Sequence, residues 1–515
     1  MKKLLIIPFL AVISIQAQFT NVMISDANNP NEPAIVIDPN NTNTMFAASN
    51  TYNYYVSTDA GVNWSENILT SSLGVWGDPS LLIDNSGNFY FFHLSNPNSG
   101  SWLDRIVCQK SSDNGISFND GTYFGLNGTK NQDKEWVIMD RDNGNIYVTW
   151  SEFDNIISPT ATDKTRILFS KSTDNAATWS APVKINEVDG NCYDSDGTVE
   201  GAVPTIGPNG EIYVSWAGPA GLVFNRSTDF GTTWLNNNIL VDTMPGGWDY
   251  NISGLVYCNG FPVTVCDISG GSNHGTIYIN WTDQRNGTDD TDVWLRKSTD
   301  GGNTWNDAVR VNDDVAGKHQ FLTWMDIDQT NGNIYIVFND RRNYNDDNTD
   351  IYLARSTDGG ETFQNVLVSE TPFVPTTTAF FGDYTNIAAH NGIIRPIWNR
   401  VHNGEASIWT ALINDSDILA TDDYFNYNFE LSQNYPNPAK EETYVSFKLR
   451  QQEKVSLTIY NILGEKQASV FDKKQFSYGK HVVKIPFLEN NLSTGVYFYK
   501  LTIGDKTTSK KMIIE

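Results

Sequence analysis

The octapeptide "STDGGNTW" occupies residues 298–305, and it decides the fold because close copies of it recur along the chain. The other five copies are "STDAGVNW" (57–64), "SSDNGISF" (111–118), "STDNAATW" (172–179), "STDFGTTW" (227–234) and "STDGGETF" (356–363). Their aspartates lie roughly 55 to 70 residues apart, a period that in a strand-rich chain is typical of propellers and solenoids.

Every period has the same order of predicted strands. In the fifth period "FPVTVCDI" (261–268), "GTIYINWTD" (275–283) and "DVWLRKSTD" (292–300) are three successive strands. The octapeptide then turns the chain into a fourth strand, "DAVRVND" (307–313). Four antiparallel strands per period make one blade, so the sequence predicts an all-β fold built as a β-propeller.

First strands, rather than octapeptides, give the number of blades. They are "EPAIVID" (32–38), "DPSLLID" (78–84), "EWVIMD" (135–140), "GAVPTIG" (201–207), "FPVTVCD" (261–267), "FLTWMDID" (321–328) and "YTNIAAH" (384–390). They predict a seven-bladed propeller, with a six-bladed one as the alternative. The last unit lacks a fourth strand, and "FTNVMISD" (19–26) is a spare one. We expect this spare strand to close the ring, which removes exposed sheet edges.

The chain divides into four segments. Residues 1–17 combine two lysines with a short apolar run, the pattern of a signal peptide for export, and no other segment is apolar enough for a membrane span. Residues 18–414 are the predicted propeller, and the acidic residues 415–430 are a predicted linker. Residues 431–515 hold alternating strands that predict a small β-sandwich.

Charge and composition limit the partners. The formal net charge is −25, which argues against nucleic acid. The sequence requires no cofactor. Three acidic loops are candidates for Ca²⁺, although none matches a complete EF-hand loop; they are residues 193–201, 286–292 and 343–350.

The four cysteines lack the spacing of a zinc site. Cys192 lies in a long loop, 187–200, and Cys258 lies in another, 242–260. Both loops belong to the same side of neighbouring predicted blades, so we predict a Cys192–Cys258 disulfide. Export makes such a bond possible.

The octapeptide resembles the Asp-box, or BNR repeat, of sialidases and related propellers. The third copy departs from the pattern, because Ala176 stands where glycine is usual. Ser and Asp side chains of such a turn can hydrogen-bond its own amides, and the final Trp or Phe can pack between blades. We therefore predict a structural role for the boxes and a site elsewhere.

The C-terminal segment resembles the sorting domain of the type IX secretion system of Bacteroidetes. The matching pieces are "NYPNPA" (434–439), "IYNILGE" (459–465), "GVYFYKL" (495–501) and "KKMIIE" (510–515). The resemblance implies that the secretion machinery is a partner. It also implies passage across the outer membrane, followed by release or by attachment to the cell surface.

The boxes join third to fourth strands, so the opposite face of the propeller carries the mouth of the channel, where ligand sites belong. First-strand starts supply Glu32, Asp78, Lys134 with Glu135, Glu200, His319 with Gln320, and Asp383 with Tyr384. Second-strand ends supply His93, Glu152, Asp283 with Arg285, Asp340 with Arg341 and Arg342, and Arg400. Carboxylates suit acid–base chemistry, and arginines bind carboxylate or sulfate groups.

The sialidase resemblance implies Tyr384 as nucleophile and Glu200 as the carboxylate that activates it. Asp78 is the third predicted catalytic residue. The predicted substrate-binding residues are Glu32, His93, Arg285, His319, Arg341, Arg342, Asp383 and Arg400.

Two family elements are missing. Glu32 replaces the first sialidase arginine, and "SWAGP" (215–219) replaces the one expected after Glu200. The sequence therefore favours a secreted or surface-attached protein that acts on extracellular glycans, as a glycosidase of altered specificity. One alternative is a propeller that binds glycan or protein without catalysis. A second is a polysaccharide lyase for uronate polymers, with His93, His319 or Tyr384 as base and Arg341 to neutralise the uronate.

Overall fold

The computed structural model describes residues 19–402, 404–419, 429–449, 452–477, 479–503 and 506–515. They divide into two compact units, Met1–Ile418 and Leu419–Glu515. The predicted signal peptide, 1–17, lies outside the described residues. No helix in the described part of the chain is long and apolar enough to cross a membrane.

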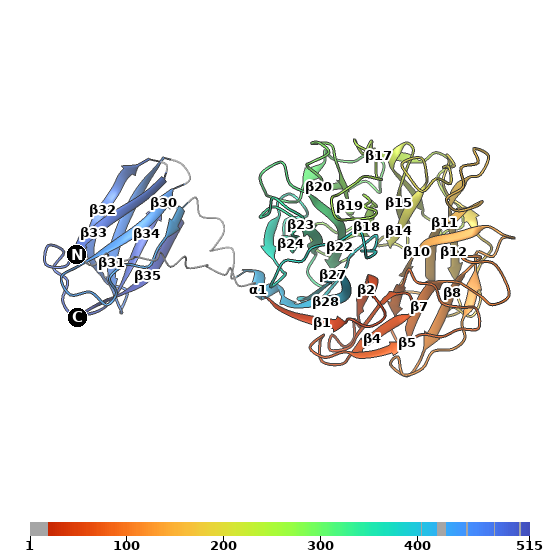
Figure 1. The fold of residues 1–515 in the computed structure, drawn as a ribbon, viewed down its shortest axis with the longest axis horizontal. Helices are drawn as coiled ribbons and strands as arrows, with labels where there is room; N and C mark the ends of the chain where they lie inside the picture. Colours follow the sequence, from red (N-terminus) through yellow and green to blue (C-terminus); the bar gives the residue numbers. More distant parts are fainter. Residues whose placement is uncertain (1–18, 403, 420–428, 450–451, 478, 504–505) are drawn as a thin grey trace, which may run out of the picture. The chain divides into compact units, whose positions relative to one another are not determined.

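The first unit contains seven four-stranded antiparallel sheets, which Figure 1 shows arranged as blades around a centre. The first blade contains β2 (Asn31–Ile37), β3 (Met45–Asn50), β4 (Asn53–Ser57) and β5 (Ser65–Ile68), and the second contains β6 (Ser80–Ile83), β7 (Phe89–Leu94), β8 (Ile106–Ser111) and β9 (Thr122–Phe124). The third blade contains β10 (Asn131–Met139), β11 (Ile146–Phe153), β12 (Thr165–Ser172) and β13 (Val183–Lys184). The fourth contains β14 (Glu200–Ile206), β15 (Ile212–Gly218), β16 (Gly221–Ser227) and β17 (Ile239–Asp242).

The fifth to seventh blades complete the ring. The fifth blade contains β18 (Val263–Cys266), β19 (Ile277–Asp283), β20 (Asp292–Ser298) and β21 (Val309–Arg310). The sixth contains β22 (Gln320–Asp328), β23 (Asn333–Asp340), β24 (Asp350–Ser356) and β25 (Gln364–Leu367). The seventh contains β26 (Asn386–His390), β27 (Ile393–His402), β28 (Glu405–Asn414) and β1 (Thr20–Ser25). The spare strand closes the ring as predicted, since β1 pairs antiparallel with β28.

The six boxes share one hydrogen-bonded turn. In each, the serine Oγ donates to the aspartate at 2.7–2.9 Å. The same oxygen accepts the amide N–H of the fifth residue at 2.8–2.9 Å. That fifth residue has a positive φ, which favours glycine, yet Ala176 adopts it with φ 64° and keeps the bond.

The last residue of each box packs against the preceding blade. Trp179 of the third box contacts Phe92 and Phe124 of the second blade, with ring centroids 5.8 and 4.6 Å away. Trp234 of the fourth box lies 5.0 Å from Phe169 of the third blade. The boxes are therefore inter-blade staples, and their structural role is confirmed.

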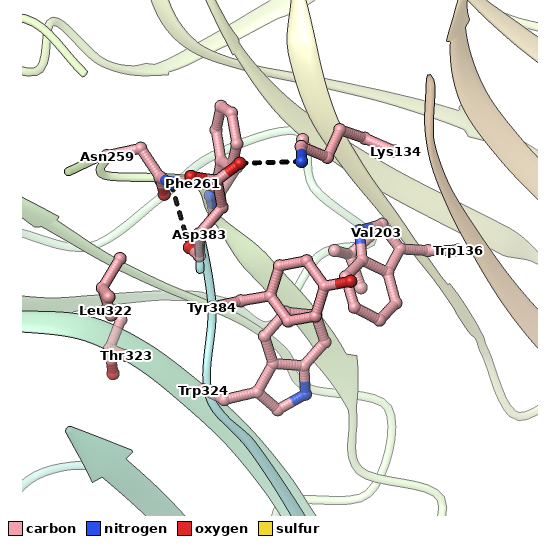
Figure 2. A pocket seen from close by; sticks show the side chains of 12 residues that line it. Lys134, Trp136, Val203, Asn259, Phe261, Leu322, Thr323, Trp324, Asp383 and Tyr384 are labelled. Carbon is pink, nitrogen blue, oxygen red and sulfur yellow. Dashed lines mark hydrogen bonds and ion pairs between the residues drawn. The ribbon is translucent and has the colours of Figure 1, made fainter. Parts of the chain in front are cut away.

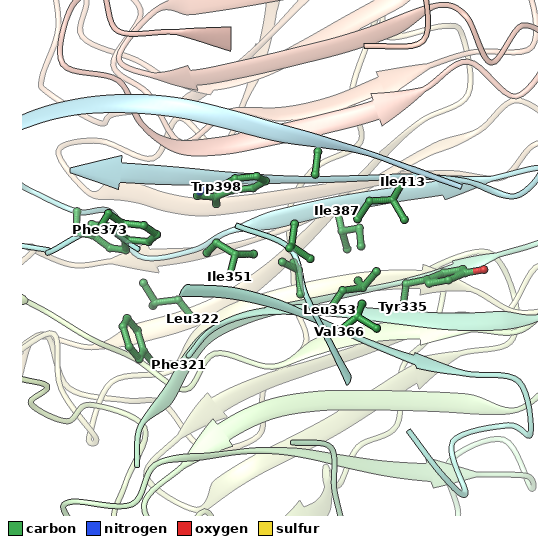
Figure 3. Close-up of a cluster of buried hydrophobic side chains, with 14 of the residues drawn as sticks. Phe321, Leu322, Tyr335, Ile351, Leu353, Val366, Phe373, Ile387, Trp398 and Ile413 are labelled. Carbon is green, nitrogen blue, oxygen red and sulfur yellow. The ribbon is translucent and has the colours of Figure 1, made fainter. Parts of the chain in front are cut away.

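Apolar faces of neighbouring blades form the core. Tyr335 and Leu353 of the sixth blade meet Ile387, Trp398 and Ile413 of the seventh, and all five side chains are buried. Figure 3 shows these side chains filling the space between the two sheets. Such burial is the main favourable contribution to the packing of the blades.

The second unit has its own core between two sheets. One sheet contains β29 (Phe429–Leu431), β30 (Glu442–Leu449) and β33 (Gly479–Pro486). The other contains β31 (Glu453–Asn461), β32 (Lys466–Phe476), β34 (Gly495–Ile503) and β35 (Lys506–Ile514). Val445, Phe447, Leu457 and Tyr499 are buried in that core, so this unit is the predicted β-sandwich.

The predicted linker starts too early in the chain. Asp415–Leu419 forms the helix α1, in which the Asp415 carboxylate accepts a hydrogen bond from Arg355 Nη2 at 2.9 Å. Ile418 is buried in the core of the sixth and seventh blades. Residues 415–418 are thus part of the first unit, because this ion pair and this apolar side chain hold them there.

The predicted disulfide is wrong, because all four cysteines are buried free thiols. Cys192 lies near the backbone of Asp154 and Asn155 in the third blade, and burial raises the pKa of its thiol. Cys258 instead packs beside Tyr250. The two loops therefore present their cysteines to different surroundings.

Candidate functional site

A repeated irregularity at the start of the first strands positions the candidate site. The pairing of first and second strands is interrupted in four blades, and the residue at that point has a positive φ: Glu32 (50°), Lys134 (52°), Gly201 (73°) and Leu322 (48°). Asp78, just before β6, has φ 51°. Such bulges re-aim side chains, and strained backbone of this kind concentrates at functional sites.

These bulges bring charged side chains from several blades together at the mouth. Lys134 Nζ lies 2.8 Å from Asp383 Oδ2, 3.3 Å from Asp78 Oδ2 and 3.8 Å from Glu32 Oε1. We call Glu32, Asp78, Lys134, Asp383 and Tyr384 the Lys134 cluster. Its members come from the first, second, third and seventh blades, so only the closed ring assembles it.

Tyr384 is the aromatic member of the cluster. Its hydroxyl donates a long hydrogen bond, 3.5 Å, to Asp78 Oδ1. Its ring packs against Trp136 at 5.0 Å and Trp324 at 6.1 Å between centroids. Figure 2 shows these three rings beside the Lys134–Asp383 pair, lining one pocket.

Neutral groups hold the carboxylates in place. The Asn50 side-chain amide donates to Glu32, and its oxygen accepts the Asp78 backbone N–H at 2.7 Å. The Asp383 backbone N–H donates to Glu32 Oε1 at 3.1 Å. The cluster is therefore an ordered network, with both side chain and backbone fixed.

The carboxyls of Asp78 and Glu32 have opposite pKa shifts. Burial raises the pKa of Asp78, but Lys134 and hydrogen bonds from Glu32, Asp133 and Lys134 outweigh burial and hold it below its usual value. Burial and the negative charge of Asp78 raise the pKa of Glu32 well above its usual value. The pair therefore shares a proton, with Asp78 ionised and Glu32 neutral.

Burial also governs the other titratable groups of the cluster. Burial, together with Asp78 and Glu32, raises the pKa of Tyr384 well above its usual value, so the phenol is protonated. Burial lowers the pKa of Lys134, but the attraction of Asp383, Asp78 and Glu32 outweighs it, and the ammonium stays charged.

Further carboxyls surround the cluster. Glu200, next to Gly201, is buried, and its Oε2 lacks a hydrogen-bond partner. Burial and the neighbouring Asp194 raise the pKa of Glu200 well above its usual value. Burial likewise raises the pKa of Glu135, whose two buried oxygens are also unpartnered. Carboxyl groups thus outnumber the lysine at this mouth.

The predicted arginines are engaged elsewhere. Arg285 pairs with Asp283 and Asp242 and lies over the Trp294 ring at 4.4 Å. Arg342 pairs with Asp340 at 2.7 Å and Asp313. These contacts brace loops of the fifth and sixth blades.

The other two arginines are only partly engaged, because Arg341 Nη2 and Arg400 Nε are buried without a hydrogen-bond partner. Arg341 pairs with Asp347 at 3.1 Å, and its Nε donates to Thr349 at 3.0 Å. Arg400 donates to Thr371 at 2.7 Å. Among the described residues, Lys134 is the cation that forms ion pairs with the cluster carboxylates.

The histidines are also apart from the cluster. His93 is fully buried and bonds the Leu94 carbonyl and Gln109, so the structure offers no route by which it contacts a substrate. Burial lowers its pKa to about 4, which keeps the ring neutral. His319 Nδ1 lies 3.0 Å from Thr291 Oγ1, and burial lowers its pKa too.

Several carboxylates of the acidic loops proposed for Ca²⁺ accept hydrogen bonds from neighbouring loops. Asp196, for example, accepts the backbone N–H groups of Trp248 and Asp249 at 2.7 and 2.9 Å. Within the described residues, no group of three or more His, Cys, Asp and Glu side chains is arranged to hold a metal ion. Calcium binding stays a prediction.

Sequence reasoning placed Lys134 at the mouth but gave it no role, and it missed Asn50, Trp136 and Trp324. Lys134 stands at the same strand-start position as Glu32 and Asp78, and this shared position could have revealed it. Asn50 ends a second strand, the position that also supplied His93 and Glu152, so the same criterion could have found it.

The sequence matches two family models. Residues 144–391 match the BNR repeat-like domain, and residues 433–515 match the secretion system C-terminal sorting domain. The chain therefore joins a β-propeller that contains a BNR repeat-like domain to a secretion system C-terminal sorting domain. The sorting domain indicates export to the cell surface or beyond. No curated protein matches the chain.

Several solved structures are similar to the chain. The Hadza microbial sialidase Hz136 is 15% identical, with 72% of this chain and 73% of that chain covered and a TM-score of 0.41. A PL25 ulvan lyase is 14% identical, with 78% and 96% covered and a TM-score of 0.46. YCF48 bound to D1 peptide is 10% identical, with 77% and 97% covered and a TM-score of 0.42. Similarities this distant leave the activity open.

Proposed function

We propose that the exported propeller acts on extracellular glycans and that the Lys134 cluster is its site of glycoside hydrolysis. The observation that carries this proposal is the ionised Asp78 beside both the neutral Glu32 and the Tyr384 hydroxyl. Carboxyls whose environments push their pKa values apart are the usual basis of acid–base assignments.

The contacts favour a different pairing from the one that the sialidase resemblance implies. Asp78, rather than Glu200, is the carboxylate at the Tyr384 hydroxyl, which suits it to act as base. Glu32 is held by Asn50 and by the Asp383 backbone N–H, whereas the buried Glu200 Oε2 has no hydrogen-bond partner, so Glu200, with its raised pKa, is the proposed acid. Asp78 thus takes the activating role that the sialidase resemblance assigns to Glu200.

The proposed reaction has two steps. Tyr384 Oη bonds to the anomeric carbon and gives its proton to Asp78, while the glycosidic C–O bond breaks and the leaving oxygen takes the proton of Glu200. Water then attacks the same carbon and gives a proton to Glu200. The bond to Tyr384 breaks, and Tyr384 recovers its proton from Asp78. The net change is hydrolysis with retained configuration.

Charge indicates the class of substrate. The mouth holds Glu32, Asp78, Asp383, Glu200 and further carboxyls, and Lys134 is already paired with three of them. Glu32 and Glu200 are neutral, but Asp78 is ionised and Lys134 is already paired, so sialic acid and uronates would find no surplus cation at the cluster. Neutral or amino-bearing glycans fit better, which lowers the support for both a sialidase and a lyase.

Binding without catalysis is the second candidate. The raised pKa of Tyr384 keeps its phenol protonated, and a protonated phenol is a hydrogen-bond donor rather than a nucleophile. Under this alternative Tyr384 and Asp383 hold sugar hydroxyls, and bound glycan is released unchanged.

The test is to incubate the purified full chain with neutral, amino-bearing, sialylated and uronate oligosaccharides and to measure both binding and products. We expect hydrolysis of a neutral or amino-bearing member. Asp78→Asn and Tyr384→Phe should each lower turnover by about 100-fold or more. Glu361→Gln, whose side chain is largely exposed on the box face, is the control and should not change turnover.

Each other outcome is informative. Binding without products, in a folded protein, favours the non-catalytic propeller and overturns hydrolysis. Cleavage that survives both Asp78→Asn and Tyr384→Phe removes the Lys134 cluster as the site. Unsaturated products from uronate polymers would establish a lyase instead.

A further inference from the structure

Two exposed tryptophans stand on the mouth side of the second blade. Trp76 and Trp102 are each 42% exposed, and their rings lie 6.0 Å apart at 89°. Trp76 precedes the first strand of its blade, and Trp102 lies between the second and third strands. Large aromatics exposed together mark an interaction surface rather than a core.

The loop that carries Trp76 is held rigidly. The Trp76 backbone N–H donates to the Leu94 carbonyl at 3.0 Å, and the Leu94 N–H donates to Gly77 at 3.1 Å. Gly74 has φ 73°, and a Cβ there would lie 2.1 Å from the Asn96 carbonyl oxygen. Glycine thus permits the close approach that fixes this loop against the next one.

The loop that carries Trp102 is tied to the third blade. The Asn131 side-chain amide donates to the Trp102 carbonyl at 2.9 Å. The Gln132 backbone N–H donates to Leu103 at 2.7 Å. Asn131 and Gln132 begin β10, the strand that carries Lys134.

Both loops therefore lead directly into the Lys134 cluster. Trp76 stands two residues before Asp78, so their Cα atoms are at most about 7 Å apart. The intervening Gly77 packs against Asn50, the residue that holds both Glu32 and Asp78. Short stretches of ordered backbone thus join the aromatic pair to the acidic cluster.

We propose that Trp76 and Trp102 form a stacking platform for a further sugar unit of the glycan held at the Lys134 cluster. This inference rests on the proposed function and extends it. The platform selects oligomeric chains over single terminal sugars. The two perpendicular indoles expose apolar surface that matches the C–H face of a pyranose ring, and contact buries both. Rigid loops keep the ordering cost of binding low.

The test measures affinity of the purified full chain for neutral and amino-bearing oligosaccharides of increasing length, from monosaccharide to hexasaccharide. We expect affinity to rise with length in the unmodified chain. Trp76→Ala and Trp102→Ala should each weaken binding of the longer members by about tenfold and leave the monosaccharide unaffected. Displacement of the nearby Asp78 is a second explanation for any effect of Trp76→Ala. Trp102 lies on a different loop, so Trp102→Ala tests the platform without displacing Asp78.

Phe230→Ala is a matched control. Phe230 is 43% exposed but lies in the fourth box on the opposite face, and the first box has Ala60 at the same position with a similar φ. Phe230→Ala should leave the affinity for every oligosaccharide unchanged.

The outcomes separate the two proposals. Length-dependent binding that both tryptophan variants retain overturns the platform and leaves the proposed function standing. A chain that binds none of these oligosaccharides overturns both. Loss of monosaccharide binding in both folded variants also overturns the platform, because the tryptophans would then belong to the reacting subsite.

Discussion

The box turns and the strand-start bulges are both repeated backbone features, one on each face of the propeller. In the boxes the residues repeat along with the geometry, so all six serines make the same hydrogen bonds. At the strand starts the positive φ repeats while the residues change, from Glu32 to Asp78, Lys134, Gly201 and Leu322. Identical side chains indicate a shared structural task, whereas a shared backbone with varied side chains indicates a site.

The largest expected effect comes from the single lysine of the cluster. Lys134→Met leaves buried carboxylates without their cation, which should lower the free energy of unfolding by about 3–5 kcal/mol. Lys297→Met removes an ion pair with the exposed Glu361 on the box face and should cost about 1 kcal/mol or less. Urea unfolding measures both.

The cost at Lys134 should also depend on pH. Carboxyls that lose their cation bind protons more readily, so the loss should be smaller at acidic pH than at alkaline pH. If Lys134→Met and Lys297→Met lowered the free energy of unfolding equally at alkaline pH, the ion pairs of the mouth face and of the box face would contribute equally to stability. That result would contradict the prediction.

Replacing the serines of the boxes should lower the free energy of unfolding by intermediate and nearly equal amounts. Ser298→Ala removes the acceptor of the Gly302 N–H and should cost about 1–2 kcal/mol, and its five counterparts should cost about the same. Alanine at Asp78, Lys134 and Leu322 should instead give widely different costs, because their surroundings differ. Thermal or urea unfolding of both series provides the comparison, and a scatter among the serines as wide as among the bulge residues would contradict it.

The smallest effect concerns acid stability. Hydrogen bonds from the seventh residue of the box hold the pKa values of Asp113, Asp174, Asp229 and Asp300 at about 2. A carboxyl with a lower pKa in the folded than in the unfolded state stabilises the fold above its unfolded pKa, near 4. That stability is lost as pH falls from about 4 toward 2.

Melting temperatures should therefore drop across that interval, and Asp300→Asn should make the drop shallower. A slope identical to that of the unmodified chain would show that the box aspartates do not contribute to acid sensitivity.

Much of the fold could be predicted because its cues are local. The boxes place glycine where φ is positive, and the alternating strands between them predict blades. Even the closing strand could be inferred, because the last unit lacks one and residues 19–26 supply it. The start of the linker could not be predicted, because the residue that binds Asp415 is Arg355, 60 residues earlier in the chain.

The candidate site was only partly predictable. Its carboxylates could be located because they stand at strand starts. Which of them is ionised depends on Lys134 and on burial, and neither is a local property. Arg285 and Arg342 each follow an aspartate by two residues, so the sequence allows both a substrate ligand and a local ion pair; the structure shows that Asp283 and Asp340 bind them.

The sequence alone determined the blade architecture, the inert role of the boxes and the C-terminal sorting domain, because each depends on residues close together in the chain. Only the tertiary structure decided that Lys134 joins Glu32, Asp78 and Asp383, since these residues are far apart in sequence and meet when the ring closes. It also decided that Asp78, rather than Glu200, lies at the Tyr384 hydroxyl. Which of these groups are protonated depends on the distances between them and on their burial, and both are properties of the folded chain.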